Sequence, residues 1–155
     1  MRYFVCLLLG LLGGFVGAYL FELQRAPSAL TVLSTPEQDA LNLPFAEGVQ
    51  LGDVIYLSGQ LGVKPGSLDV VPGGIGPQTR QALENIQASL RRYGSDLDQV
   101  LKCTVFMADM ADWPAMNVVY QEMFAGHRPA RSALGAGGLA LGAELEIECI
   151  ARVNR

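Results

Sequence analysis

The chain has 155 residues and a formal net charge of -4, from 11 Lys and Arg, 15 Asp and Glu and one His. This length suits one domain of ordinary size. The acidic balance gives no reason to expect a nucleic-acid partner, which would favour a basic face. The single histidine, His127, rules out a multi-histidine metal site, and the three cysteines lack the paired spacing of metal ligands. We therefore expect no metal site and no nucleic acid.

The first segment is long and apolar, running from Tyr3 to Phe21 without a charge. Nineteen helical residues at about 1.5 Å each span roughly 28 Å, close to the hydrocarbon core of a bilayer. Residues 1–25 are therefore predicted to form a transmembrane anchor. A cleaved signal peptide is the alternative, although its apolar region is normally shorter and no clear Ala-x-Ala site follows.

Positive charge at the amino terminus and Arg2 lies on the short side of this span. The positive-inside rule then predicts that the N-terminus stays in the cytoplasm and that the following domain is extracytoplasmic, or periplasmic in a Gram-negative bacterium. Residues 26–43 have two prolines and no sustained period, so we interpret them as a linker with room for a short strand at Leu30 to Leu33.

The remaining residues, 44–155, alternate between strand and helix patterns. Apolar residues at steps of three, four and three predict a helix from Pro77 to a stop at Gly94. A second helix is predicted from the cap Asp112, with an inward face of Met116, Val119, Tyr120 and Met123. Strands are predicted before, between and after these helices, at about 49–51, 54–58, 100–108, 130–136 and 143–153.

This order of elements, β-β-α-β-α-β-β, predicts an α+β domain with two helices packed on one face of a mixed β-sheet. Two helices cannot cover both faces, so another subunit is expected against the second face. Cys103 and Cys149 fall in predicted strands. We expect both to be buried free thiols. An oxidising compartment would also permit a disulfide bond between them.

Arg131 is the only charge in the stretch "ARSALGAGGLALGA", from Ala130 to Ala143. A guanidinium donates two parallel hydrogen bonds to a carboxylate and stays charged at any relevant pH, and small neighbours leave room for a ligand. The arrangement indicates a carboxylate clamp. A salt bridge across a subunit interface is the alternative.

Several blocks in order resemble the RidA family (YjgF/YER057c/UK114): "LSGQLGV", "QTRQALENIQASLRRYGSDLDQVLKCTVFMADMADWPAMNVVYQEMF", "PARSA" and "LEIECIA". The resemblance covers about residues 44–153. It implies a chorismate-mutase-like fold and homotrimers with ligand clefts between subunits. It also implies hydrolysis of reactive 2-imino acids or their enamines to 2-keto acids and ammonia, with no metal or organic cofactor.

By this resemblance, Arg131 matches the arginine that holds the substrate carboxylate, and Glu146 matches the glutamate that positions or activates water. Taken alone, Glu146 belongs to an acidic ladder with Glu144 and Glu148, and a solvated strand face is the favoured interpretation. The spacing from Arg131 to Glu146, which equals that of the family, reverses this preference. Three like charges on one strand face repel, so we expect at least one to have a different environment.

The other carried-over positions are substrate-binding candidates. Ser58 and Gly59 match cleft positions, although Gly59 would also suit a tight strand end. Asn117 matches a frequent family asparagine and would also suit bracing of its own helix. Phe45 stands where the family usually has tyrosine, which removes a hydroxyl, and Ala133 replaces a usual cysteine.

Two functions are compatible with these residues. The first is an enamine and imine deaminase in which Arg131 clamps the carboxylate and Glu146 serves water. The second is a non-catalytic, membrane-tethered trimeric binding module for small carboxylates, favoured by Phe45, Ala133 and the anchor.

Overall fold

The computed structural model describes residues 29–154, which fold around one mixed β-sheet. The strands follow the spatial order β1-β2-β3-β7-β5-β6, and the short β4 pairs with β7 beside β3. All pairs are antiparallel except β5 with β6, which is parallel. The strand bounds are β1 Leu30–Leu33, β2 Gly48–Leu51, β3 Val54–Leu57, β4 Gln60–Leu61, β5 Val100–Met107, β6 Ala130–Gly135 and β7 Leu145–Arg152.

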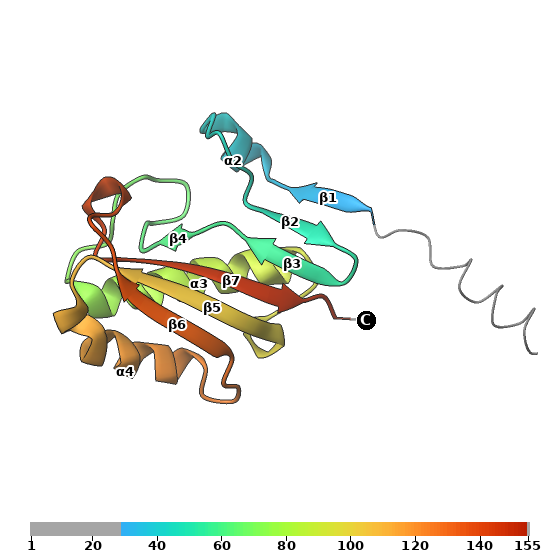
Figure 1. Cartoon of the computed structure of the whole chain (residues 1–155). Coiled ribbons are helices and arrows are strands. Elements are labelled where there is room, and N and C mark those ends of the chain that lie inside the picture. Colours follow the sequence, from blue (N-terminus) through green and yellow to red (C-terminus); the bar gives the residue numbers. More distant parts are fainter. Residues whose placement is uncertain (1–28, 155) are drawn as a thin grey trace, which may run out of the picture.

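Two long helices, α3 (Ile75–Arg92) and α4 (Trp113–Met123), lie on the same side of this sheet. Figure 1 shows α3 behind the central strands and α4 along β6. The predicted α+β architecture, with two helices on one face of a mixed sheet, is confirmed. Within residues 29–154, three single turns of 3-10 helix complete the connections, at Leu97–Gln99, Met110–Asp112 and Ala140–Gly142.

The core forms where α3 packs on β5 and β7. One face of α3 is fully buried at the predicted positions Leu83, Ile86 and Leu90. Alternate residues of β7, from Leu145 to Ala151, point into the same layer. Gly94, with φ of 78°, ends the helix as predicted, because a left-handed turn favours glycine.

The segment predicted as a linker, 26–43, contributes to the sheet from residue 30 onward. β1 pairs with β2 in the register Leu30 to Leu51, so the short strand expected at Leu30 to Leu33 is confirmed. A short helix that the sequence had not indicated, α2 (Pro36–Ala40), follows it, and the Thr35 hydroxyl caps the Gln38 amide at 3.2 Å. The ordered domain therefore begins well before residue 44.

The predicted membrane span, Tyr3 to Phe21, lies outside the described residues. Between residues 29 and 154 there is no helix that combines the length and the apolar character needed to cross a bilayer.

The expectation of two free thiols is wrong. Cys103 on β5 and Cys149 on β7 are joined by a disulfide bond. They are direct register partners with 4.2 Å between their Cα atoms, and both side chains are buried. Periodicity placed both cysteines in strands, but only the antiparallel pairing of those strands sets them opposite each other.

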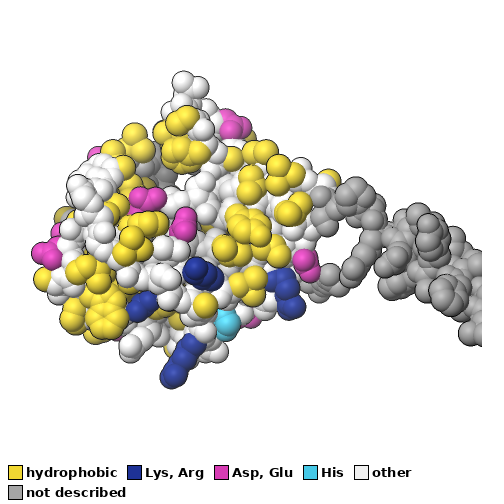
Figure 2. All heavy atoms as spheres, in the orientation of Figure 1, with side chains coloured by type: hydrophobic (Ala, Val, Ile, Leu, Met, Phe, Trp, Pro, Cys, Tyr) yellow, Lys and Arg dark blue, Asp and Glu magenta, His cyan; other side chains and the backbone are white. Residues whose placement is uncertain are grey.

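The face of the sheet turned away from the helices carries apolar side chains. Tyr56 on β3 and Leu134 on β6 are each 43% exposed, and Phe106 on β5, the register partner of Leu134, is half-buried. Figure 2 views this side and shows hydrophobic atoms spread over it, with acidic and basic side chains between them. In a single chain this face is uncovered, as two helices on one side predict.

Candidate active site

Arg131 lies on β6, at the edge of the sheet among the described strands, and projects toward the helices. Its register partner on β5 is Cys103, whose side chain is in the core beneath α3 and α4. Arg131 therefore leaves the sheet on the helix-covered face. Its guanidinium carbon lies 4.6 Å from the ring centroid of Tyr120 and 5.9 Å from that of Trp113, and Nη1 is 3.8 Å from the Met116 sulfur.

No carboxylate within residues 29–154 forms a salt bridge with Arg131. The side chain is half-buried, so part of its hydration has been replaced by aromatic and thioether surface rather than by a counter-ion. Such a cation is suited to receive an anionic ligand, because the ligand would supply the missing charge.

Glu146 lies on β7 and projects from the opposite face of the sheet. Its neighbours Leu145 and Ile147 are buried toward the helices, so alternation places Glu146 on the open side. A Cβ atom added at Gly59 would lie 1.7 Å from Glu146 Oε1 and 2.6 Å from its Cδ. The missing side chain at Gly59 makes room for this carboxylate, so the structure brings these two predicted site residues together.

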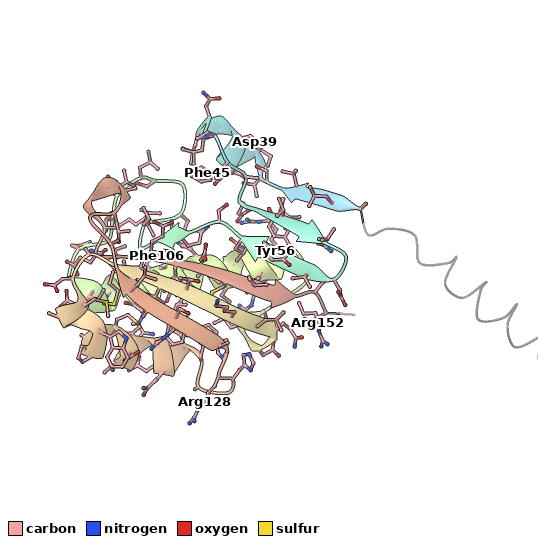
Figure 3. The ribbon with its side chains drawn as sticks, in the orientation of Figure 1. Asp39, Phe45, Tyr56, Phe106, Arg128 and Arg152 are labelled. Carbon is pink, nitrogen blue, oxygen red and sulfur yellow. A yellow bond between two sulfur atoms is a disulfide. The ribbon has the colours of Figure 1, made fainter. Side chains whose placement is uncertain are left out.

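Ser58 connects this pair to the loop that carries Phe45. The Ser58 hydroxyl donates to the Ala46 carbonyl at 2.7 Å, and the Ser58 amide donates to the Glu47 carbonyl at 2.9 Å. Phe45 is 53% exposed beside these bonds. Figure 3 shows Phe45 in the loop before β2.

Glu47, which no sequence pattern indicates, holds the same loop against the end of α3. Its buried carboxylate accepts hydrogen bonds from the Ser89 hydroxyl at 2.5 Å, from Arg92 Nη1 at 2.7 and 2.9 Å, and from the Tyr93 hydroxyl at 2.6 Å. Burial, followed by the hydrogen bond to Glu47, raises the pKa of Tyr93 to about 12. Only the fold could reveal this cluster, because Glu47 is more than forty residues from its three partners.

Asn117 and Ala133 lie with Arg131 rather than with Glu146. Asn117 follows Trp113 by four residues on α4 and precedes Tyr120 by three, so it shares the helix side that meets Arg131. Its side chain is half-buried. Ala133 is two residues beyond Arg131 on β6 and packs against the core on the same face.

The predicted site residues thus form two groups. Group A contains Arg131, Asn117 and Ala133 and lies on the helix-covered side of the sheet. Group B contains Phe45, Ser58, Gly59 and Glu146, and its Glu146 projects from the opposite face. In register, Glu146 pairs with Phe106, and Phe106 pairs with Leu134, three residues beyond Arg131. A single chain does not bring Arg131 and Glu146 together.

The residues that contact Arg131 were missed as site residues. The apolar pattern predicts Met116 and Tyr120 only on the inward face of the second helix, and it gives Trp113 no role. The available signal was the spacing of Trp113, Met116 and Tyr120 at steps of three and four, which places all three on one helix face. That spacing is equally typical of core packing, so it did not by itself indicate a site.

The chain is similar to proteins of one family along most of its length. The family model described as endoribonuclease L-PSP matches residues 37–153. The mouse (Mus musculus) protein named 2-iminobutanoate/2-iminopropanoate deaminase is 41% identical over 120 residues, covering 77% of this chain and 89% of that protein.

Two solved structures have the same fold. A Yersinia pestis protein, YyfA, of the conserved Rid protein family has a TM-score of 0.75 at 34% identity, covering 81% of this chain and all of that one. Escherichia coli TdcF, solved with bound serine, has a TM-score of 0.67 at 33% identity, covering 84% and 95% of the two chains. The motifs, the fold and the length of these matches agree, and the chain belongs to the L-PSP endoribonuclease family, which is the RidA family.

Proposed function

We propose that this protein hydrolyses reactive 2-imino acids, and the enamines in equilibrium with them, to 2-keto acids and ammonia. The observation that carries the proposal is the half-buried guanidinium of Arg131, which has no carboxylate partner within residues 29–154. The deaminase names of relatives about 40% identical to this chain support the same reaction, and the serine bound to TdcF is a small ligand with a carboxylate.

Arg131 and Glu146 have complementary tasks in this reaction. Arg131 binds the substrate carboxylate through its two parallel N–H donors. Glu146 orients a water molecule and accepts its proton as the oxygen adds to the imine carbon. The proton then passes from Glu146 to the amino nitrogen of the resulting carbinolamine, and ammonia leaves as the carbon–nitrogen bond breaks and the keto group forms. An enamine first takes a proton on carbon to become the imine.

The separation of groups A and B leads us to propose that the complete site lies between two copies of the chain. Arg131 with group A of one copy would face Glu146 with group B of the next. A head-to-tail contact of this kind can close into a ring, and the family resemblance implies three copies, so we propose a homotrimer with three equivalent clefts. The apolar open face, with Tyr56, Phe106 and Leu134, supports burial against neighbouring copies.

The lining of the cleft would differ from that of relatives with tyrosine and cysteine at the two substituted positions. Phe45 offers an exposed ring without a hydroxyl, and Ala133 offers a methyl group without a thiol. Both changes make the lining more apolar, so we expect a preference for imines with apolar side chains. Binding without turnover, which would make the protein a small-carboxylate binding module, is the other outcome of the test below.

We also propose that the N-terminal segment anchors the protein and that the domain is extracytoplasmic. The disulfide between Cys103 and Cys149 supports this placement, because such bonds persist in oxidising compartments. Protease added to intact cells, or to cells whose outer membrane alone is opened, should degrade the domain. Protection until the inner membrane is lysed would contradict the proposed orientation.

The activity test generates 2-imino acids with an amino-acid oxidase and traps the surviving imine with semicarbazide. The wild-type protein should suppress trapping, and Arg131→Ala should lose this effect because the carboxylate is no longer held. Lack of suppression by folded wild-type protein, across imines with small, branched and aromatic side chains, would contradict the proposed reaction. Retained binding of a 2-keto acid in that case would identify the binding module.

A further inference from the structure

Arg131 contacts three side chains from one face of α4, and this surface points to a function of its own. We call Trp113, Met116 and Tyr120 the aromatic platform, although its central member is a thioether. The three side chains come from one face of α4. The guanidinium carbon lies 5.9 Å from the Trp113 ring centroid and 4.6 Å from that of Tyr120, and Nη1 lies 3.8 Å from the Met116 sulfur. Tyr120, the nearest ring, is 6% exposed, so its contact with Arg131 is largely shielded from water.

An arginine side chain has several rotatable bonds, and a clamp is effective only when its planar fork points at the ligand. A ring within about 6 Å attracts a guanidinium electrostatically, most strongly where water is excluded. Among the described residues no acidic side chain competes for Arg131, so the platform supplies its main side-chain contacts. These contacts restrain the guanidinium without neutralising it, and its charge remains available to a ligand.

We propose that Tyr120, assisted by Trp113, is a positioning residue that presents the Arg131 guanidinium to the substrate carboxylate. The proposal rests on the proposed function, since it assigns Arg131 to carboxylate binding. Tyr120 acts through Arg131 and needs no contact with the ligand. Its loss should therefore weaken carboxylate binding and raise KM, while kcat changes much less.

The proposed role of Tyr120 does not depend on a hydrogen bond from its hydroxyl. It is buried and has no hydrogen-bond partner within residues 29–154. The useful part of Tyr120 is therefore its ring, and Tyr120→Phe should keep the function that Tyr120→Leu loses.

Phe124 provides a control that distinguishes the positioning role from general packing of the core. Its ring centroid is 4.6 Å from that of Tyr120, and its side chain is 5% exposed, so it is buried to the same extent. Within the described part of the chain, the rings that form cation–π contacts with Arg131 are those of Trp113 and Tyr120, and Phe124 is not among them. Phe124→Leu thus removes a buried ring from the same place in the fold and leaves the platform intact, which makes it the matched control.

The experiment measures the Kd of the full-length protein for 2-ketobutyrate by calorimetry, together with kcat and KM in the imine assay. Thermal melting confirms that each variant is folded. Tyr120→Leu should weaken binding about fivefold to tenfold, the size expected for a shielded cation–π contact. Trp113→Leu should weaken binding about twofold to threefold, because its ring is farther away and more exposed. Tyr120→Phe and Phe124→Leu should bind as the wild type does.

Each result has a distinct meaning. Equal binding by wild type and Tyr120→Leu, with both folded, would overturn the positioning role and leave the proposed function standing. An equal loss in Phe124→Leu would also overturn it, because general packing would then explain the effect. If Tyr120→Leu does not fold, unchanged binding in Trp113→Leu overturns it. Failure of the wild type to bind any 2-keto acid and to suppress trapping would contradict the proposed function itself, and the positioning role with it.

Discussion

Because Gly59 has no side chain, the Glu146 carboxylate can occupy the space beside its Cα atom. The nearest atoms to an added Cβ at that position all belong to the Glu146 side chain, at 1.7, 2.6 and 2.9 Å. Because this neighbour is the end of a flexible side chain, it can rotate away at little cost to stability. The structure therefore predicts that a change at Gly59 affects the reaction more than the fold.

Gly59→Ala should displace the Glu146 carboxylate and lower kcat/KM by about 100-fold, the cost of misplacing a catalytic group by roughly 1 Å. Its melting temperature should stay near that of the wild type. The matched control is Gly137→Ala, because an added Cβ there meets no atom within 4 Å. Full activity in Gly59→Ala would show that Glu146 does not act from the position described.

Two tyrosines make the stability of the folded protein depend on pH in the alkaline range. Burial raises the pKa of Tyr93 and of Tyr120 from 10.0 to about 12, and the positive charge of Arg131 opposes the effect at Tyr120. The unfolded chain therefore loses these protons at a lower pH than the folded protein does. This stabilising contribution is fully present below pH 10 and is lost as the pH rises through about 12.

Urea denaturation at intervals from pH 9 to pH 12 checks this dependence. The midpoint should fall steeply above pH 10, and the fall should be shallower in Tyr120→Phe, which has no proton to lose at that position. An identical slope in the variant would mean that Tyr120 titrates at its ordinary pKa in the folded protein.

Between elements, a buried polar cluster joins the residue before β2 to the end of α3. Glu47 is buried, and three side chains of α3 and its cap donate to it, namely Ser89, Arg92 and Tyr93. By contrast, the ion pair of Arg80 with Glu122, which joins α3 to α4, has side chains 46% and 54% exposed. Burial should make the first connection matter far more than the second.

Glu47→Ala should lower the free energy of unfolding by about 2 kcal/mol, because it leaves the buried Ser89 hydroxyl and the half-buried Tyr93 hydroxyl without their acceptor. Glu122→Ala should lower it by about 0.5 kcal/mol or less, since exposed ion pairs contribute little. Chemical denaturation of both variants provides the comparison. Similar losses in the two variants would mean that the Glu47 cluster contributes no more than a surface pair.

The sequence was most informative about elements and least informative about their pairing. Periodic apolar residues predicted α3, α4 and the alternating strand β7, because each pattern is local. Strand order is not local, so the sequence predicts free thiols at Cys103 and Cys149, whereas the structure joins them in a disulfide. The same limit hid the placement of Arg131 and Glu146 on opposite faces. Family resemblance had supplied both residues but not their relative positions.

At the level of the whole molecule, the disulfide ties two central strands across 46 residues of sequence. Closing a loop of that size should stabilise the protein by about 2–4 kcal/mol. Reduction should therefore lower the free energy of unfolding by that amount. Under denaturing conditions a thiol-specific polymer label should add once without reductant, at Cys6, and three times after reduction. Three additions without reductant would contradict the bond.

The central claim is that Arg131 of one copy and Glu146 of the next complete each site. The most direct test co-expresses Arg131→Ala and Glu146→Gln chains with different tags and purifies assemblies that carry both. Each variant alone should be inactive. In any mixed ring of three, one interface joins the intact Arg131 to the intact Glu146, so about one third of the wild-type imine hydrolysis should return. Absence of any recovery in mixed trimers would contradict the shared site, because residues contributed by a single chain cannot complement one another.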